Sequence, residues 1–162
     1  MIVNYFEKTL IGRPEQWLID AAIDIGLDFT NLSHEITNEL ISHSIKRHGN
    51  HILHGAATIT STDFDYIPDI IKTPDYAVIG GMRKKILINA YAKIEKDITY
   101  LYFENVLISR KNKALRGKTL YKVTRPLSLD EFLKNVSKNE KTDISKAKVL
   151  KNVQTAGGHP GG

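Results

Sequence analysis

The sequence predicts an α+β fold in which N-terminal helices pack on one face of a roughly four-stranded antiparallel sheet. Two observations lead to this prediction. The hydrophobic residues follow a helical spacing up to about residue 75, and beyond that point they alternate with polar residues. The later apolar runs are joined by short turns, which is typical of hairpins and therefore of antiparallel pairing.

Three helices are expected in the first half of the chain. The run at 15–28 places its apolar residues on one helical face. A second helix is expected over 34–50, with Ser33 as its N-cap. A third, short helix follows a capping box formed by Thr60 and Asp63.

The second half predicts a sheet followed by one more helix. Short turns separate four strand candidates at 76–80, 85–94, 98–108 and 118–123. A capping box of Ser128 and Glu131 then opens a helix over 128–136. We expect one domain at 1–136, with its core at 33–124, and a weakly ordered tail at 137–162 that is rich in lysine and glycine.

Length and composition favour a single soluble domain. The chain has 162 residues, of which 41% are hydrophobic and 25% are charged. It has no cysteine, which excludes disulfides, thiolate metal sites and a cysteine nucleophile. The sequence shows no membrane span and no secretory leader. We therefore expect no membrane partner and a cytoplasmic location in the producing or target bacterial cell, with delivery by a phage or within a larger protein as the alternative.

Charge is distributed unevenly along the chain. Residues 1–75 have a net charge of −6, whereas residues 76–162 have a net charge of +11. The densest stretch, 110–125, has seven basic residues and no acidic one. Such a stretch suits a polyanion such as nucleic acid, although a solvated basic face explains the same charges equally well. For a nucleic-acid partner, we expect substrate binding by Lys113, Arg116, Lys118 and Lys122.

Histidines are concentrated in one short segment. Five of them fall within 21 residues, namely His34, His43, His48, His51 and His54. A metal site is one interpretation, but zinc sites usually present their ligands in a fixed helical register, and the sequence has no HExxH motif. We therefore predict no metal and no cofactor, and a surface or hydrogen-bonding role remains the alternative for each histidine.

A histidine-rich helix end beside a basic sheet suits RNA cleavage without a metal. The 2′-OH of RNA can attack the adjacent phosphorus when a base removes its proton and an acid protonates the leaving 5′-oxygen. Cations stabilise the charge that develops on the phosphorane. Histidine titrates near neutral pH and suits either proton transfer, while lysine and arginine supply the positive charge.

The order of several short strings resembles a known nuclease superfamily. LISHSIKRHGN is followed by IPDIIKTPD, then by YLYFENV, the basic loop and KTLYKV. This pattern, over residues 33–124, resembles the phage-associated branch of the barnase–EndoU–colicin–RelE-like (BECR) nuclease superfamily. The resemblance implies helices packed on a four-stranded antiparallel sheet. It also implies a metal-independent endoribonuclease, used as a toxin or phage effector, that forms a 2′,3′-cyclic phosphate. The resemblance implies RNA, including tRNA, as the partner. An immunity or antitoxin protein would be a second possible partner.

The resemblance assigns proton transfer and phosphate binding to particular residues. His48, in the His-Gly string, would transfer a proton, and His43 is a second candidate. Lys85 and Arg110 would hold the phosphate. The alternatives are a histidine that favours the helix C-terminus and cations that are simply solvated.

The last two strands provide three further candidates by the same resemblance. Thr119 and Tyr121 are two residues apart and therefore face the same side of a strand, where they would bind or protonate the phosphate. Glu104 would act as a base or orient a histidine or arginine, and this chain has Asn105 where a second acid is common. Cross-strand packing and an edge salt bridge are the structural alternatives.

Two other functions fit the same sequence. A non-catalytic nucleic-acid-binding module would use the basic loop for phosphates and tyrosines for base stacking. It would bind in a salt-dependent manner without cleavage. A structural domain of a phage protein would instead use the basic half to contact an acidic protein.

Overall fold

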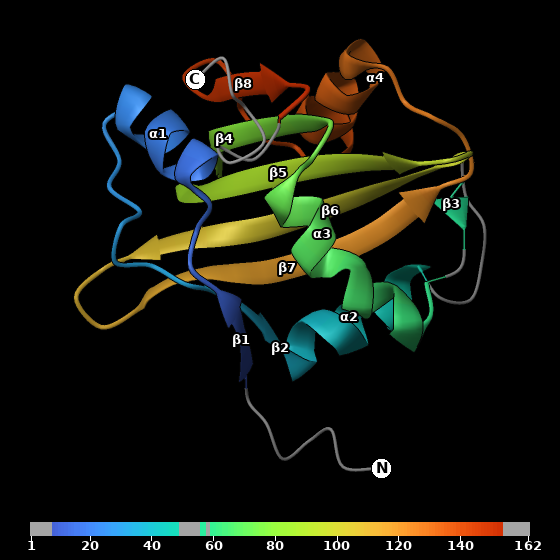
Figure 1. Cartoon of the computed structure of the whole chain (residues 1–162), viewed down its shortest axis with the longest axis horizontal. Coiled ribbons are helices and arrows are strands. Elements are labelled where there is room, and N and C mark those ends of the chain that lie inside the picture. The colour runs from blue at the N-terminus through green and yellow to red at the C-terminus, as the bar shows by residue number, and fades with distance from the viewer. Residues whose placement is uncertain (1–7, 49–55, 58, 154–162) are drawn as a thin grey trace.

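The computed structural model describes residues 8–48, 56–57 and 59–153. They form one sheet with helices on both faces, which confirms the α+β class (Figure 1). The strands are β1 (Lys8–Gly12), β2 (His34–Thr37), β3 (Ala56–Ala57), β4 (Tyr76–Arg83), β5 (Ile86–Glu95), β6 (Ile98–Ile108), β7 (Lys113–Val123) and β8 (Lys148–Lys151). The helices are α1 (Gln16–Asp24), α2 (Asn38–His48), the 3-10 helix η2 (Ser61–Tyr66), α3 (Ile67–Lys72), α4 (Leu129–Lys134) and the π-helical turn η3 (Asn135–Asn139). No described helix is long and apolar enough to cross a membrane.

The sheet is larger than the four strands that the sequence predicts. Its strand order is β1-β2-β7-β6-β5-β4-β8, and β3 pairs separately with β7. The long strands β4 to β7 form the expected antiparallel meander, and β6 has the predicted bounds of 98–108. The predicted number of strands is too low because the sequence does not reveal β1, β2, β3 and β8, which have five residues or fewer. Alternation over so few residues gives a weak sequence signal.

Residues 34–37 form strand β2 rather than the first turn of a helix. Thr37, not Ser33, caps helix α2, since its Oγ1 accepts a hydrogen bond from the Leu40 amide at 3.1 Å. The β-branched pair Ile36–Thr37 suits a strand. Strand β1 pairs with β2 on one side, antiparallel, and β7 pairs with it on the other side, parallel. Tertiary pairing therefore overrides the helical pattern at this end.

Helices cover both faces of the sheet, contrary to the expectation of one face. Trp17 of α1 packs edge-on against Tyr91, with ring centroids 6.1 Å apart. Phe132 of α4 stacks on Tyr76 at 5.8 Å. Tyr76 pairs with Ala92, the residue after Tyr91, and consecutive residues of a strand face opposite sides. Helices α1 and α4 therefore lie on opposite faces.

The expectation of a weakly ordered tail is wrong for residues 137–153, part of which pairs with the sheet. Strand β8 pairs along β4, and the backbone of Asp143 pairs with Met82. Backbone pairing of this kind does not depend on an apolar composition, so the lysine-rich sequence conceals it. Residues 154–162 lie outside the described part of the chain.

Three segments cover the outer edge of β7 in succession. Strand β2 pairs with β7 at Leu115 and Arg116, and β3 pairs with it at Lys122 and Val123. Between them, the Leu120 amide donates a hydrogen bond to the side chain of Ser44 on α2 at 3.0 Å. Helix α2 therefore runs beside β7, which positions its side chains next to that strand.

A buried carboxylate fixes the start of η2 against the sheet. Asp63 accepts hydrogen bonds from the Thr60 amide at 2.8 Å and from the Tyr100 hydroxyl at 2.8 Å. Its carboxylate also pairs with the Lys122 ammonium at 3.1 Å. Burial raises the pKa of Asp63, but these hydrogen bonds and the charge of Lys122 outweigh it, so the pKa lies below its ordinary value. The predicted capping box is confirmed, as is the one at Ser128.

We expect Asp63→Asn to destabilise the fold by about 1–3 kcal/mol at pH 7, since it weakens hydrogen bonds to a buried charge. A carboxyl whose folded pKa is lowered stabilises the protein above its unfolded pKa, and this stabilisation is lost as the pH falls through the folded pKa. The difference in thermal midpoint between wild type and variant should therefore shrink on acidification below the ordinary value of 3.8.

The exposed neighbour Asp65 provides the control for this measurement. Asp65→Asn should change the midpoint little at either pH. A gap for Asp63→Asn that stays constant down to pH 2 would contradict the role of the ionised carboxylate.

Candidate active site

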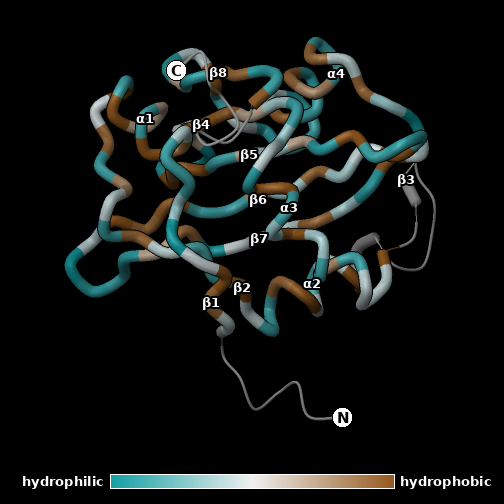
Figure 2. The backbone as a smooth tube through the Cα atoms, in the orientation of Figure 1, coloured by the Kyte–Doolittle hydropathy of each residue, from teal (hydrophilic) through white to brown (hydrophobic). Residues whose placement is uncertain are grey.

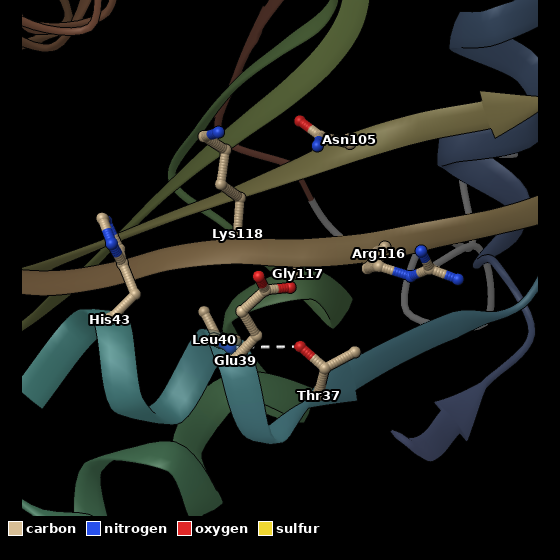
Figure 3. A pocket seen from close by; sticks show the side chains of 8 residues that line it. All are labelled: Thr37, Glu39, Leu40, His43, Asn105, Arg116, Gly117 and Lys118. Carbon is tan, nitrogen blue, oxygen red and sulfur yellow. Dashed lines mark hydrogen bonds between the residues drawn. The ribbon is translucent and has the colours of Figure 1, made fainter. Parts of the chain in front are cut away.

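A pocket of about 210 Å³ lies where β2 passes into α2 beside β7 (Figure 3). Four elements line it. They contribute Thr37 from β2, Glu39, Leu40 and His43 from α2, Asn105 from β6, and Arg116, Gly117 and Lys118 from β7. The pocket thus combines a carboxylate, an imidazole and two cations.

Helix α2 places Glu39 and His43 on the same side of the pocket. The two residues are four apart, which puts them one above the other on one helical face, with Cβ atoms about 5–6 Å apart. The Thr37 cap starts the helix at the end of β2, so this face begins immediately at the sheet. Glu39 is exposed, whereas His43 is half-buried and its Nε2 atom is buried.

A β-bulge in β7 directs Lys118 toward the pocket. Phe103 pairs with Thr119, but the next residue of β6, Glu104, pairs with Gly117, so Lys118 is the additional residue. Bulges redirect a side chain out of the regular alternation and are frequent beside active sites. Within the described chain, Lys118 forms no ion pair, and it is half-buried. Its ammonium is therefore available to a ligand.

Arg116 is held in place by a buried acid. Its Nε donates to the Glu35 carboxylate at 2.6 Å, and the two residues are also paired neighbours in β7 and β2. The Glu35 side chain is 3% exposed, whereas that of Arg116 is 34% exposed. A short charge-assisted contact of this kind fixes the guanidinium while part of it stays accessible.

Beneath the pocket, Glu104 is the centre of a buried polar cluster. Its Oε1 lies 2.8 Å from Nδ1 of His34, and its Oε2 accepts from the Asn89 amide at 3.0 Å and from the Tyr91 hydroxyl. An ionised carboxylate only accepts, so we assign the proton to Nδ1 of His34. Burial, together with the charge of Glu104, raises the pKa of Tyr91 well above its ordinary value, so the phenol remains a donor.

Gly117 allows this cluster to form directly behind the pocket. It pairs with Glu104, and a Cβ at Gly117 would overlap the Tyr102 hydroxyl and lie 2.9 Å from Cδ2 of Leu40. The absence of a side chain leaves room for the Tyr102 ring and for Leu40 of α2. Among the described residues, the buried Tyr102 hydroxyl has no hydrogen-bond partner.

The structure brings together only part of the predicted site. His43, Arg116 and Lys118 line the pocket, with Glu104 beneath it. His48 is the last residue of α2, and its side chain lies outside the described part of the chain. The prediction for His48 therefore stays a prediction.

Other predicted residues lie away from the pocket. Thr119 and Tyr121 are buried on the α4 face, where the Tyr121 hydroxyl donates to Asn135 at 2.5 Å. Lys122 pairs with Asp63 on the opposite face. The remaining three cations are exposed at one end of the sheet: Lys85 and Arg110 lie on loops, and Lys113 is the first residue of β7.

Sequence reasoning did not select Thr37, Glu39 or Asn105. The spacing of four between Glu39 and His43 is a signal that could have pointed to the first acid, since it predicts a shared helical face. Asn105 and Thr37 enter the pocket through sheet pairing, which the sequence alone does not define. Over the described ranges, no group of three or more His, Asp or Glu residues is arranged to hold a metal ion.

We expect Gly117→Ala to destabilise the protein by about 1–3 kcal/mol, because the added methyl group overpacks the space beside Tyr102 and Leu40. Tyr102→Phe alone should be neutral or stabilising, since it removes a buried hydroxyl without a partner in the described chain. Denaturant unfolding of both single variants and of the double variant measures the coupling. Strictly additive effects would contradict the proposed overlap.

Residues 13–128 match the family described as phage-Barnase-EndoU-ColicinE5/D-RelE like nuclease 3. No curated protein and no solved structure matches the chain. The matched segment contains every residue that lines the pocket and the whole of the meander. It also covers most of the chain, which confirms the resemblance seen in the order of the sequence strings. The chain belongs to this family of phage-associated BECR-like nucleases.

Proposed function

We propose that the protein is a metal-independent endoribonuclease and that the pocket between α2 and β7 is its active site. One observation carries this proposal: a carboxylate, an imidazole and two cations line the same small pocket, namely Glu39, His43, Arg116 and Lys118. These are the groups that transesterification of RNA requires. Membership of a nuclease family supports the same assignment.

The proposed reaction proceeds by attack of the ribose 2′-OH on the adjacent phosphorus. The Glu39 carboxylate accepts the 2′-OH proton, and the new bond from the 2′-oxygen to phosphorus forms a phosphorane. The bond from phosphorus to the 5′-oxygen then breaks, and the imidazolium of His43 donates its proton to that oxygen. The products are a 2′,3′-cyclic phosphate and a free 5′-OH.

Nδ1 is the nitrogen of His43 that we expect to exchange this proton. Nε2 of the ring is buried, although the residue as a whole is half-exposed and lines the pocket. Because a buried nitrogen is shielded from a substrate in the pocket, this proposal assigns the proton transfer to Nδ1. The assignment agrees with the requirement that a catalytic acid lie within hydrogen-bond reach of the atom it protonates.

Arg116 and Lys118 supply the positive charge that other nucleases obtain from metal ions. The contact with Glu35 preorganises the Arg116 guanidinium, and the bulge presents Lys118 from the same strand. Cations fixed in this way stabilise developing charge without reorganisation during the reaction. The substrate is then RNA, including tRNA, because DNA has no 2′-OH. The corresponding compartment is the bacterial cytoplasm, where an immunity or antitoxin protein would bind the same site.

The wild-type protein should cleave RNA in the presence of EDTA and leave ends with a 2′,3′-cyclic phosphate. Gel assays with total RNA, tRNA and a matched DNA oligonucleotide, followed by mass spectrometry of the products, check this expectation. We expect no cleavage of DNA. Intact RNA in every substrate class, or cleavage that EDTA abolishes, would refute the proposed chemistry.

We expect His43→Ala to lower the cleavage rate by about 10²–10⁴-fold because it removes a proton-transfer group. Lys118→Ala should lower it by about 10²–10³-fold through loss of charge stabilisation. Lys134→Ala is a matched control, since this lysine is exposed on α4 and pairs only with Asp130 among the described residues.

The same assay compares His43 with His48, the histidine that the sequence resemblance favours. Thermal midpoints of all variants establish that they are folded. A large loss for His48→Ala with full activity of His43→Ala would move the acid from the pocket to the end of α2 and overturn the site assigned above.

A further inference from the structure

Two loops at one end of the sheet carry a dense group of cations, which we call the cationic rim. The β4–β5 turn contributes three of them and the β6–β7 loop with the first residue of β7 contributes the others. The members are Arg83, Lys84, Lys85, Arg110, Lys111 and Lys113. All but Arg83 are exposed, and the β6–β7 loop is hydrophilic in Figure 2.

Strand register places both loops at the same end of the sheet. Arg83 pairs with Ile86 across the first turn, and Ile108 pairs with Lys113 across the second. Both loops lie on the left side of Figure 1. Strand β6 separates β5 from β7, so the two groups of cations are about 10 Å apart, the width of two strand spacings.

The rim cations are not used within the described fold. None of the six takes part in an ion pair with a described residue. Asp143 pairs through its backbone with Met82, the residue before Arg83, but its carboxylate accepts a hydrogen bond from the Ser145 amide. The rim therefore presents uncompensated positive charge to solvent, which attracts a polyanion.

The backbone of the β4–β5 turn places two of these lysines in a conformation that lysine rarely adopts. Lys84 and Lys85 have φ values of 49° and 69°, the left-handed region that lysine rarely adopts. A two-residue hairpin turn with both central φ values positive favours Asn-Gly. Lysine at both positions lacks this preference, so replacement by Asn-Gly removes two charges while it suits the conformation of the turn.

The rim is continuous with the pocket along β7. Arg116 lines the pocket and lies three residues from Lys113, which corresponds to about 10 Å along a strand. Asn105 of β6 pairs with Arg116 and lies three residues before Ile108, where the loop begins. An extended RNA strand bound in the pocket can therefore continue directly onto the rim.

We propose that the cationic rim binds the RNA backbone that flanks the cleaved phosphodiester, and that it contributes substrate affinity rather than bond breaking. The proposal rests on the ribonuclease function above. It separates the predicted phosphate ligands into two groups, with Arg116 and Lys118 at the reacting phosphate and Lys85, Arg110 and Lys113 at its flank.

The principal test is the variant Lys84→Asn/Lys85→Gly, measured for both stability and RNA affinity. The thermal midpoint should rise by about 2–4 °C, because Asn-Gly fits the left-handed turn. The affinity for single-stranded RNA, measured by fluorescence anisotropy in the uncleaving His43→Ala background, should fall about three- to tenfold. The slope of log Kd against log salt should decrease by about 1.4, as expected for two lost phosphate contacts.

A second variant removes charge without changing the turn. Arg110→Gln/Lys113→Gln should weaken RNA binding and lower the salt slope in the same way, with no rise in thermal midpoint. In cleavage assays, both double variants should raise KM for long RNA much more than for a dinucleotide, which is too short to reach the rim.

Lys96→Asn is the matched control. Lys96 is an exposed lysine with a φ of 58° in the β5–β6 turn, at the opposite end of the sheet. Its replacement should also raise the thermal midpoint but leave RNA affinity unchanged. Equal losses of affinity for Lys96→Asn and the rim variants would show that only net charge matters, and would overturn the proposal.

The outcomes separate this inference from the proposed function. If wild type fails to cleave RNA but the rim variants still bind it more weakly, the ribonuclease assignment fails and the rim remains an RNA-binding surface. If cleavage proceeds and the rim variants bind RNA like wild type, the rim proposal fails. Binding of polyglutamate at the rim in preference to RNA would likewise refute it and indicate an acidic protein partner.

Discussion

The interaction between His34 and Glu104 joins the two parts of the molecule that form the candidate site. Glu104 is fully buried in β6 and gathers donors from β2 and β5. An unpaired carboxylate at that depth would be very costly, so each donor is needed. Because His34 is the first residue of β2, this contact draws β2 against β7 and fixes the point at which α2 begins. Gly117 lies opposite Glu104 in this arrangement, and its lack of a side chain leaves space for the Tyr102 ring and for Leu40 of α2.

The pocket follows from this arrangement through two neighbouring residues of β2. His34 faces the buried cluster, and the next residue, Glu35, faces the other side of the sheet and holds Arg116. Thr37 then caps α2, which brings Glu39 and His43 to the same edge. A four-residue strand therefore sets the positions of both the proposed proton-transfer groups and one of the two cations.

The sequence predicts the long elements well and the short ones poorly, for physical reasons. The bounds of strand β6 agree with the prediction because its 11 residues are rich in aromatic and aliphatic side chains and lie between two polar turns. Strand β2 was missed because four residues take their conformation from the strands on either side. The basic composition points to Arg116 and Lys118, which line the pocket, whereas the family resemblance points to Thr119 and Tyr121, which are buried on the α4 face. The alternation of residues along a strand does not reveal which face of that strand a later helix covers.

The residues of the candidate site come from elements of different stability, and this links the stability of the fold to the proposed activity. The pair of Glu39 and His43 is local, since one helical turn creates it, whereas its union with Lys118 depends on β2 docking to β7 across a long stretch of chain. Short edge elements open at lower free energy than a central meander of long strands. Opening of β2 alone would separate the proton-transfer groups from the cations while β4, β5 and β6 remain paired. The buried contact of His34 with Glu104 opposes that opening, together with the backbone pairing of β2 and the contact of Glu35 with Arg116.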